Sequence, residues 1–443
     1  MASSGSRAAP LSAASKLNPP PRNADLALVR ARIETACLAL FALAASYYIA
    51  FHPTFIGDYQ VDGGPTISAL VHGHLPHSQP AMGPLSIWLR TPFAWLVRDH
   101  TVLAQYRMGA FACILVAGAV GVCLARVLLA NGRSAWLAFA VVAFSVLNPA
   151  NFHAMANGHP EEILGAALCV AAVVAAVEGR SVLVVGVLLG LAIATKQWAV
   201  LAIGPTLIAA SRGRVRIALL AVGLAVLLTA PMALPNLHGF AASNRNSADA
   251  TIGLMPDSIW VPFEHVHHVR IFDGVAWRTI EKRTMSHAIA GHAKPLIVLL
   301  GALLPLAYML LRRGARREEA LLLLALLFAL RCALDPLTTA YYHAPFLLAL
   351  MAYECRYSRG PPLLTTIGGI VIWYLTMRVV WIIEPHKVTA IYLAWMVPLL
   401  GYLGVRVYAP SVISDFGKWL STSLPPSVTI ARSSIRTPNA PGR

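Results

Sequence analysis

Two carboxylates four residues apart lie in the first polar segment of the chain, the stretch GDYQVDGGP at 57–65. The glycines beside Asp58 and Asp62 let backbone or a ligand approach closely. A carboxylate next to a cavity at a membrane surface can take a proton from a hydroxyl nucleophile. Asp62 could instead cap a helix that begins near Pro65. The stretch therefore predicts either a general base, Asp58 or Asp62, or the start of a helix.

A histidine and two glutamates stand together in the stretch NGHPEE at 157–162. Glu161 and Glu162 would open a helix, where acidic side chains interact favourably with the positive end of the helix dipole. His159 and the two carboxylates could also bind an acceptor sugar or a divalent metal, although their spacing matches no known metal-ligand pattern. We expect a helix start here, with His159, Glu161 and Glu162 as candidates for acceptor or metal binding.

A lysine interrupts an apolar stretch at Lys196, where Gln197 and Trp198 follow it. A charged side chain in such a stretch is costly and usually functional. The ammonium group could extend toward the membrane surface, or it could face a cavity at a helix break. In a cavity its natural partner would be a phosphate.

Aromatic and histidine side chains gather at two further places. In DPLTTAYYH at 335–343, Tyr342 and His343 could approach a sugar or a phosphate, or they could belong to an interfacial aromatic belt. In EHVHH at 264–268 a histidine-rich tract could bind metal. For this second tract we expect a solvated loop.

The composition sets the class of protein that must position these groups. Of the 443 residues, 57% are hydrophobic and only 12% are charged, about half the charged fraction of a soluble domain. So few charges cannot cover a water-facing surface, so most of the surface must face a lipid bilayer. The net charge of +16 lies mostly in short arginine-bearing segments between apolar runs, which is typical of cytoplasmic loops and argues against binding of nucleic acid.

Apolar runs predict an all-α polytopic membrane protein with about 11–12 membrane-embedded helices. Two of them, 181–195 and 198–210, are short and meet at Thr195-Lys196-Gln197. They could be two short helices that meet partway across the bilayer, or one broken helix. The runs fall at 33–51, 108–129, 134–149, 161–178, 181–195, 198–210, 216–233, 293–311, 318–334, 341–354, 363–383 and 388–408.

The basic residues predict the orientation. With alternate crossings, the arginine-bearing turns all fall on one side together with both tails, so we expect both termini in the cytoplasm and a multi-pass plasma-membrane protein. Residues 1–27 should be a disordered tail, 28–408 the membrane domain, and 409–443 a basic tail. Two long external loops are expected at 52–107 and 234–292. Within the first, residues 84–98 predict a helix lying in the membrane interface.

The order of these motifs resembles the C superfold of membrane glycosyltransferases. An acidic residue in the first external loop is followed by GHPEE at the start of the fourth helix, GLAIATKQ in the broken fifth segment and a late YYH. More narrowly, the chain resembles the bacterial mannosyltransferases that use polyprenol-phosphate-mannose. The resemblance covers residues 52–345, and the order, side and spacing of the motifs together carry it.

The resemblance implies transfer of a sugar from a polyprenyl-phosphate donor to an external glycan or glycolipid acceptor in the cell envelope, with inversion. An aspartate would act as base: Asp62, which leads the stretch 63–73, or failing that Asp58. Lys196 would hold the donor phosphate, with Gln197, Tyr342 and His343 beside it. His77 stands where the family has an aromatic residue, so mannose or another hexose or pentose is left open as the donor sugar.

Two other functions suit the same pattern. A transporter or lipid flippase without covalent chemistry would also place ionisable groups in a membrane cavity. The clustering of carboxylates on one external face favours an enzyme over a transporter. A catalytically inactive member of the same superfold is the third alternative. No cofactor is certain from the sequence, and a divalent metal is an open possibility.

Overall fold

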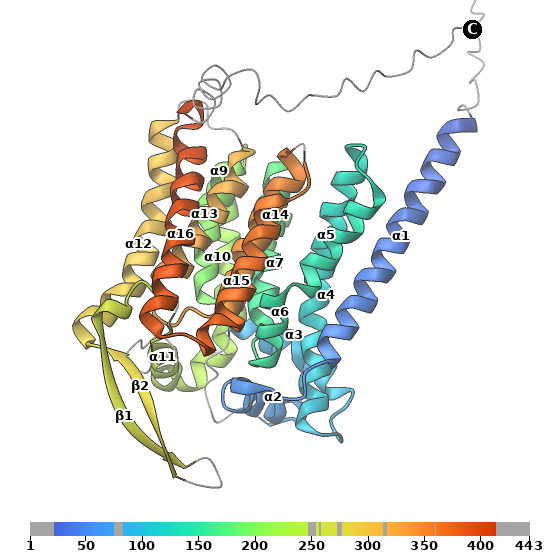
Figure 1. The fold of residues 1–443 in the computed structure, drawn as a ribbon. Coiled ribbons are helices and arrows are strands. Elements are labelled where there is room, and N and C mark those ends of the chain that lie inside the picture. Colours follow the sequence, from blue (N-terminus) through green and yellow to red (C-terminus); the bar gives the residue numbers. More distant parts are fainter. Residues whose placement is uncertain are drawn as a thin grey trace, which may run out of the picture.

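The chain is described here by a computed structural model over residues 22–74, 83–246, 254–256, 258–272, 277–312, 317–358 and 360–412. These residues are mostly helical, and the long helices run side by side in one bundle (Figure 1). Within this described part, seven helices are long and apolar enough to cross a membrane. They are Leu28–Phe51, Val102–Ala130, Ala135–Ala156, Pro160–Val177, Arg214–Ser243, Ile289–Leu311 and Pro385–Tyr408. The predominantly helical fold is thus confirmed, and the seven apolar helices are compatible with the polytopic membrane protein that the sequence predicts.

The first half of the chain forms ten helices and two short 3₁₀ turns among the described residues. The helices follow the expected apolar runs closely, although α1 begins at Arg22, inside the segment expected to be a disordered tail. They are α1 (Arg22–Phe51), α2 (Gly64–Val71), α3 (Pro84–Trp95), α4 (Val102–Ala130), α5 (Ala135–Leu147), α6 (Pro149–Ala156), α7 (Pro160–Val177), α8 (Val182–Thr195), α9 (Ile203–Ala209) and α10 (Arg214–Ala233), with η1 (Gly57–Gln60) and η2 (Gln197–Ala202).

The second half adds further helices and one β-hairpin. Its helices are α11 (Leu237–Asn246), α12 (His287–Leu311), α13 (Glu319–Leu334), α14 (Ala344–Tyr357), α15 (Leu363–Met377) and α16 (Pro385–Tyr408). The remaining elements are η3 (Leu234–Asn236), η4 (Val261–Phe263), η5 (Ala340–His343), η6 (Val379–Trp381), β1 (Glu264–Phe272) and β2 (Trp277–Met285). The first turn of α1 and the last turn of α16 lie at the same end of the bundle (Figure 1).

The segments α8 and α9 form a hairpin whose tip is Lys196. The backbone there is extended, with φ −152° and ψ 144°, so α8 cannot continue into η2. The two arms meet again at the other end: a Cβ atom on Gly213, just after α9, would lie 2.6 Å from the Cγ2 atom of Val182 at the start of α8. Of the two alternatives left by the sequence, the structure has two short helices that meet partway.

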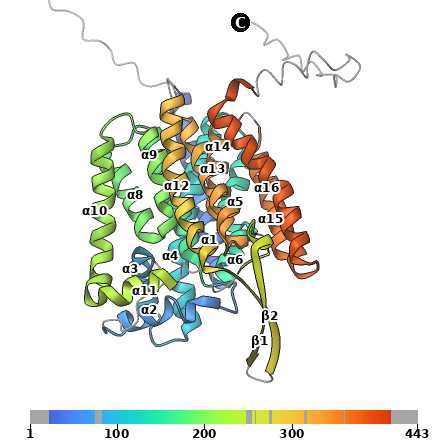
Figure 2. The ribbon, with the colours of Figure 1, turned by 90° about the vertical axis from the view of Figure 1, so that its left-hand side faces the viewer.

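The β-hairpin replaces the solvated loop expected at 264–268, so that expectation was wrong. Strands β1 and β2 pair antiparallel over their full lengths, from Glu264 opposite Met285 to Phe272 opposite Trp277. The β-branched residues Val266, Val269 and Ile271 favour an extended backbone. The hairpin extends beyond the bundle at the end that carries α2 and α11 (Figures 1 and 2).

The segment 84–98 forms a helix, α3, as expected, but not the surface helix that the sequence predicts. It does not lie freely in the membrane interface, because Arg90 is fully buried. The N-terminus of α3 abuts the tip of the α8–α9 hairpin, where a Cβ atom on Gly83 would lie 1.9 Å from the carbonyl oxygen of Thr195. The indole Nε1 of Trp88 donates a hydrogen bond of 2.9 Å to the Leu228 carbonyl of α10. Helix α3 therefore belongs to the packed wall around Lys196.

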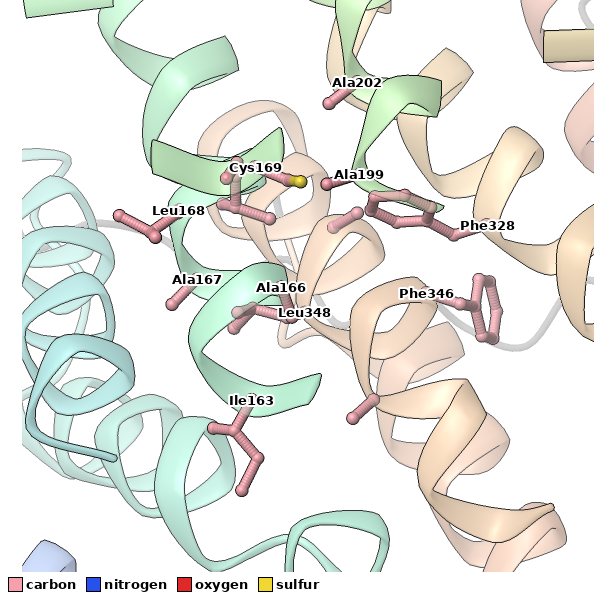
Figure 3. Close-up of a cluster of buried hydrophobic side chains, with 14 of the residues drawn as sticks. Ile163, Ala166, Ala167, Leu168, Cys169, Ala199, Ala202, Phe328, Phe346 and Leu348 are labelled. Atoms are coloured by element: carbon pink, nitrogen blue, oxygen red, sulfur yellow. The ribbon is translucent and has the colours of Figure 1, made fainter. Parts of the chain in front are cut away.

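Helix α7 forms the centre of the bundle. Its small residues let η2, α13 and α14 approach closely, and these elements surround it in Figure 3. At Gly165 a Cβ atom would already lie 3.2 Å from the ring of Trp198. This packing fixes the first turn of α7, which carries two glutamates into the bundle.

Candidate functional site

Two glycines pack the segment after α1 closely against the start of α7. Gly158 has φ +85°, and a Cβ atom there would lie 2.5 Å from the Ile56 carbonyl oxygen. Gly57 has φ +40°, and a Cβ atom there would lie 2.7 Å from the Asn157 carbonyl oxygen. The Asp58 amide donates a hydrogen bond of 3.1 Å to the Asn157 carbonyl. This contact brings Asp58 close to His159, the residue after Gly158.

His159 bridges two carboxylates. Its Nε2 atom lies 3.1 Å from Oδ2 of Asp58, and its Nδ1 atom lies 2.8 Å from Oε1 of Glu161. Burial alone would lower the pKa of His159, but the Glu161 charge and the hydrogen bonds to both carboxylates outweigh it and raise this pKa to about 9. The hydrogen bond from His159 lowers the pKa of Asp58. At neutral pH the ring is therefore an imidazolium between two carboxylates.

Asp62 lies in the same cluster and does not cap a helix. The helix that follows, α2, begins after Gly63 and has no side-chain cap. Burial raises the pKa of Asp62, and the nearby Asp58 charge acts in the same direction. One ligand atom from each of Asp58, Asp62 and His159 can be chosen so that all lie within 4.8 Å of one another. These three residues could hold a divalent cation, provided that the metal replaced the imidazolium proton.

Lys196 lies against the first turn of α7. Its Nζ atom is 3.1 Å from Oε1 of Glu161 and 3.5 Å from Oε1 of Glu162. Glu161 also lies 3.8 Å from Arg90, and Glu162 lies 3.5 Å from Arg331. These contacts join α3, α7, α13 and the hairpin tip into one buried ionic network.

The charges of this network balance. Four carboxylates, those of Asp58, Asp62, Glu161 and Glu162, face four cations, those of Arg90, His159, Lys196 and Arg331. Buried charges are tolerated when each is paired and hydrogen-bonded. An added anion would therefore gain most where further cations stand close to the network.

One further cation, Lys294 of α12, lines a cavity of about 170 Å³ beside Lys196. The network residues Arg331 and Glu162 lie on the same wall, together with Asp335. The guanidinium carbon of Arg331 lies 4.7 Å from the ring centre of Trp198 and 4.4 Å from that of Tyr342. This sandwich holds the planar group in one orientation.

The cavity reaches the outer surface of the bundle along α12. Ile297 and Val298 of this apolar helix line it, and Val298 is 55% exposed. Helix α12 packs closely on α9, because at Gly301 a Cβ atom would lie 2.4 Å from Leu201. A cavity lined by three cations and two carboxylates thus opens beside an apolar, partly exposed helix.

The structure brings most of the predicted site residues together, but not all. Gln197 and Tyr342 line the cavity with Lys196, as the sequence suggested. His343 is buried elsewhere: its Nδ1 atom lies 3.0 Å from the Thr339 carbonyl and its Nε2 atom 2.9 Å from the Tyr392 hydroxyl. His77 lies outside the described residues.

Three cations of the site were not predicted from the sequence. Arg331 interrupts the apolar run 318–334, and such an intramembrane charge is itself a signal of function. Arg90 lies within 84–98, the segment that the sequence predicts to be a helix in the membrane interface. Nothing in the sequence near Lys294 indicates its place on the cavity wall. No protein-family model matches this chain, and no curated protein matches it.

Proposed function

We propose that this protein is a membrane glycosyltransferase of the C superfold, which moves a sugar from a polyprenyl-phosphate donor to an external glycan or glycolipid. The observation that supports this most strongly is the cavity beside apolar α12, whose wall carries Lys196, Lys294 and Arg331. The ionic network joins this cavity to the exposed carboxylate of Asp58. A lipid-linked phosphate has the charge for this cavity and the chain for the neighbouring lipid. We place about 11–12 segments in the plasma membrane and both termini in the cytoplasm.

The proposed roles follow from charge and position. Lys196, Lys294 and Arg331 bind the donor phosphate, and Gln197 and Tyr342 complete the wall around it. Ammonium and guanidinium groups make the strongest hydrogen bonds to phosphate oxygens. The prenyl chain leaves the cavity along α12. These cations stabilise the charge that grows on the phosphate oxygen as the sugar departs.

The reaction has one bond forming and one breaking. The acceptor hydroxyl oxygen attacks the anomeric carbon from the side opposite the phosphate, so the configuration inverts. The bond between the anomeric carbon and the phosphate oxygen breaks, and polyprenyl phosphate leaves with the electron pair. The hydroxyl proton passes to an aspartate carboxylate.

Asp58 is our first choice for this base, and Asp62 is the second. The side chain of Asp58 is 63% exposed, so an acceptor can reach it, and the bond from His159 keeps it ionised. Asp62 attracts a proton more strongly, because burial raises its pKa, but it is less accessible. The sequence alone favours Asp62, whereas the contact with the network that reaches Lys196 favours Asp58.

The proposal is tested with purified protein in lipid nanodiscs, a synthetic polyprenyl-phosphate mannose and a membrane glycan extract. Release of polyprenyl phosphate together with labelled glycan supports transfer. Donor that binds, or crosses the bilayer, without release would instead support a transporter or flippase. A folded protein that neither binds nor cleaves any polyprenyl-phosphate hexose or pentose would overturn the proposal.

A further inference from the structure

A second cavity, of about 260 Å³, lies at the opposite end of the α8–α9 hairpin from Lys196. Its walls come from the turn that joins α7 to α8 and the turn that joins α9 to α10. Arg180 and Arg212 line it, one from each turn, and they are the charged members of its described lining. Ser181 and Ser211 stand beside them.

The backbone holds these two turns together. Gly213 has φ +69°, and the Val182 side chain occupies the space that a Cβ atom there would need. The Nε atom of Arg214 donates a hydrogen bond of 3.3 Å to the Ala210 carbonyl, which ties α10 to the end of α9. The cavity is therefore a fixed feature of the hairpin base.

The surroundings of the cavity are strongly positive. Arg214 and Arg216 follow Arg212 at the start of α10, and Arg180 stands in the other turn. Glu178 pairs with Arg180 at 3.1 Å and with Arg356 at 3.0 Å. Arg212 on the cavity wall and the neighbouring Arg214 and Arg216 add further positive charge, so a bound anion would meet a surplus of it.

The chemistry of the lining suits a phosphate. Guanidinium groups bind phosphate oxygens through paired hydrogen bonds. The Ser181 hydroxyl oxygen already accepts from the Val184 amide, so its proton remains available to donate. The turn that joins α9 to α10, which lines the cavity, lies at the end of the bundle that also carries the last turn of α16 (Figure 2).

The neighbouring surface distinguishes a lipid from a free anion. Leu183 of α8 and Val215 and Leu219 of α10 are 61%, 73% and 67% exposed, and they flank the arginines on the outside of the bundle. Acyl chains would cover these side chains while a headgroup lay among the arginines. We infer that this cavity binds the phosphate of an anionic phospholipid headgroup, at the face that the arginine pattern assigns to the cytoplasmic leaflet.

The test compares retention of phosphatidylglycerol and phosphatidylcholine on the purified full chain by native mass spectrometry. We expect the wild type to prefer phosphatidylglycerol, and the double variant Arg180→Gln, Arg212→Gln to lose about thirtyfold in that preference. The matched control is Arg30→Gln, Arg32→Gln, which removes two exposed arginines of α1. A second variant, Ser211→Asp, keeps both arginines but adds a negative charge, and it should also lower the preference.

The outcomes separate the possible sources of the anion. An equal loss in the control pair would mean that net charge alone attracts the lipid, and would overturn the site. Inorganic phosphate that raises the melting temperature as much as phosphatidylglycerol does, with no lipid preference in the wild type, would overturn the lipid assignment. This site is independent of sugar transfer, so lack of transferase activity leaves the test unaffected.

Discussion

The Nε2 atom of His159 lies 3.1 Å from Oδ2 of Asp58, and this contact joins an exposed carboxylate to a buried ionic network. Through the other ring nitrogen the same imidazolium reaches Glu161, which in turn contacts Lys196. The proposed proton acceptor and the proposed phosphate ligand are thus two side chains apart. Changes at either end should be felt at the other.

Replacing Asp58 with Asn should abolish most turnover while donor binding survives. Asparagine keeps the shape of the side chain but cannot take the proton, so we expect a fall in kcat of about 10²–10⁴-fold. Donor release assays and equilibrium binding of the labelled donor would measure the two effects separately. Asp62→Asn is the matched variant. Full activity in Asp58→Asn, with loss only in Asp62→Asn, would move the base to Asp62.

The stability that His159 contributes should depend on pH. Because folding raises its pKa from 6.5 to about 9, the folded protein holds the proton more tightly than the unfolded chain does. The contribution is therefore complete below pH 6.5 and is lost as the pH rises toward 9. The difference in melting temperature between wild type and His159→Gln should shrink over this window. A difference that stays constant would mean that the ring acts through packing alone.

The same variant should move the pH profile of turnover. Without the hydrogen bond from His159, the pKa of Asp58 should rise, so the acidic limb of the profile should shift to higher pH. Rates measured across the acidic range in wild type and His159→Gln would check this. An unmoved limb together with reduced activity would exclude Asp58 as the titrating base.

Lys196 should be needed for donor binding even when the net charge of the ionic network is left unchanged by a second substitution. Lys196→Met alone leaves Glu161 and Glu162 short of a cation, and breaking a buried ion pair costs about 3–5 kcal/mol of stability. The double variant Lys196→Met, Glu162→Gln removes one charge of each sign. We expect it to recover stability but not donor affinity, which should remain about ten- to a hundredfold weaker.

Thermal unfolding and donor binding on the same preparations would measure both properties. Glu162→Gln alone is the reference for the double variant, because it keeps Lys196 but also removes the carboxylate partner of Arg331. Recovery of normal donor affinity in the double variant would show that Lys196 only balances charge.

Gly158→Ala should separate the segment after α1, which carries Asp58, from the start of α7. The added Cβ atom would lie 2.5 Å from the Ile56 carbonyl oxygen, so Asp58 should be displaced from His159. Gly132→Ala is a matched control, because Gly132 has φ +72° but no atom within 4 Å of the added Cβ. Both variants bear the left-handed strain of about 1–2 kcal/mol. Turnover should fall only in Gly158→Ala, and equal losses in the two would refute the displacement.

The sequence predicted the parts of this protein that depend on local pattern. Apolar runs marked the helices, and a lysine between two short runs marked the tip of a hairpin. What it could not show was which charges meet across the fold. Arg331 and Glu162 are separated by 169 residues and lie 3.5 Å apart, a pairing that neither segment reveals on its own. The strands at 264–285 were missed because several histidines hid a modest β-branched pattern.

A small tilt of α8 at the base of the α8–α9 hairpin moves the tip at Lys196 by a larger distance. An arm of 14 residues extends about 21 Å at about 1.5 Å per residue, and its base lies between the arginines of the second cavity. If the arm tilts as a rigid body by about 5°, the tip moves by about 2 Å. The 3.1 Å contact between Lys196 and Glu161 would not survive such a displacement. A rigid tilt of α8 about its arginine-bearing base would therefore break the contact that holds Lys196 against α7.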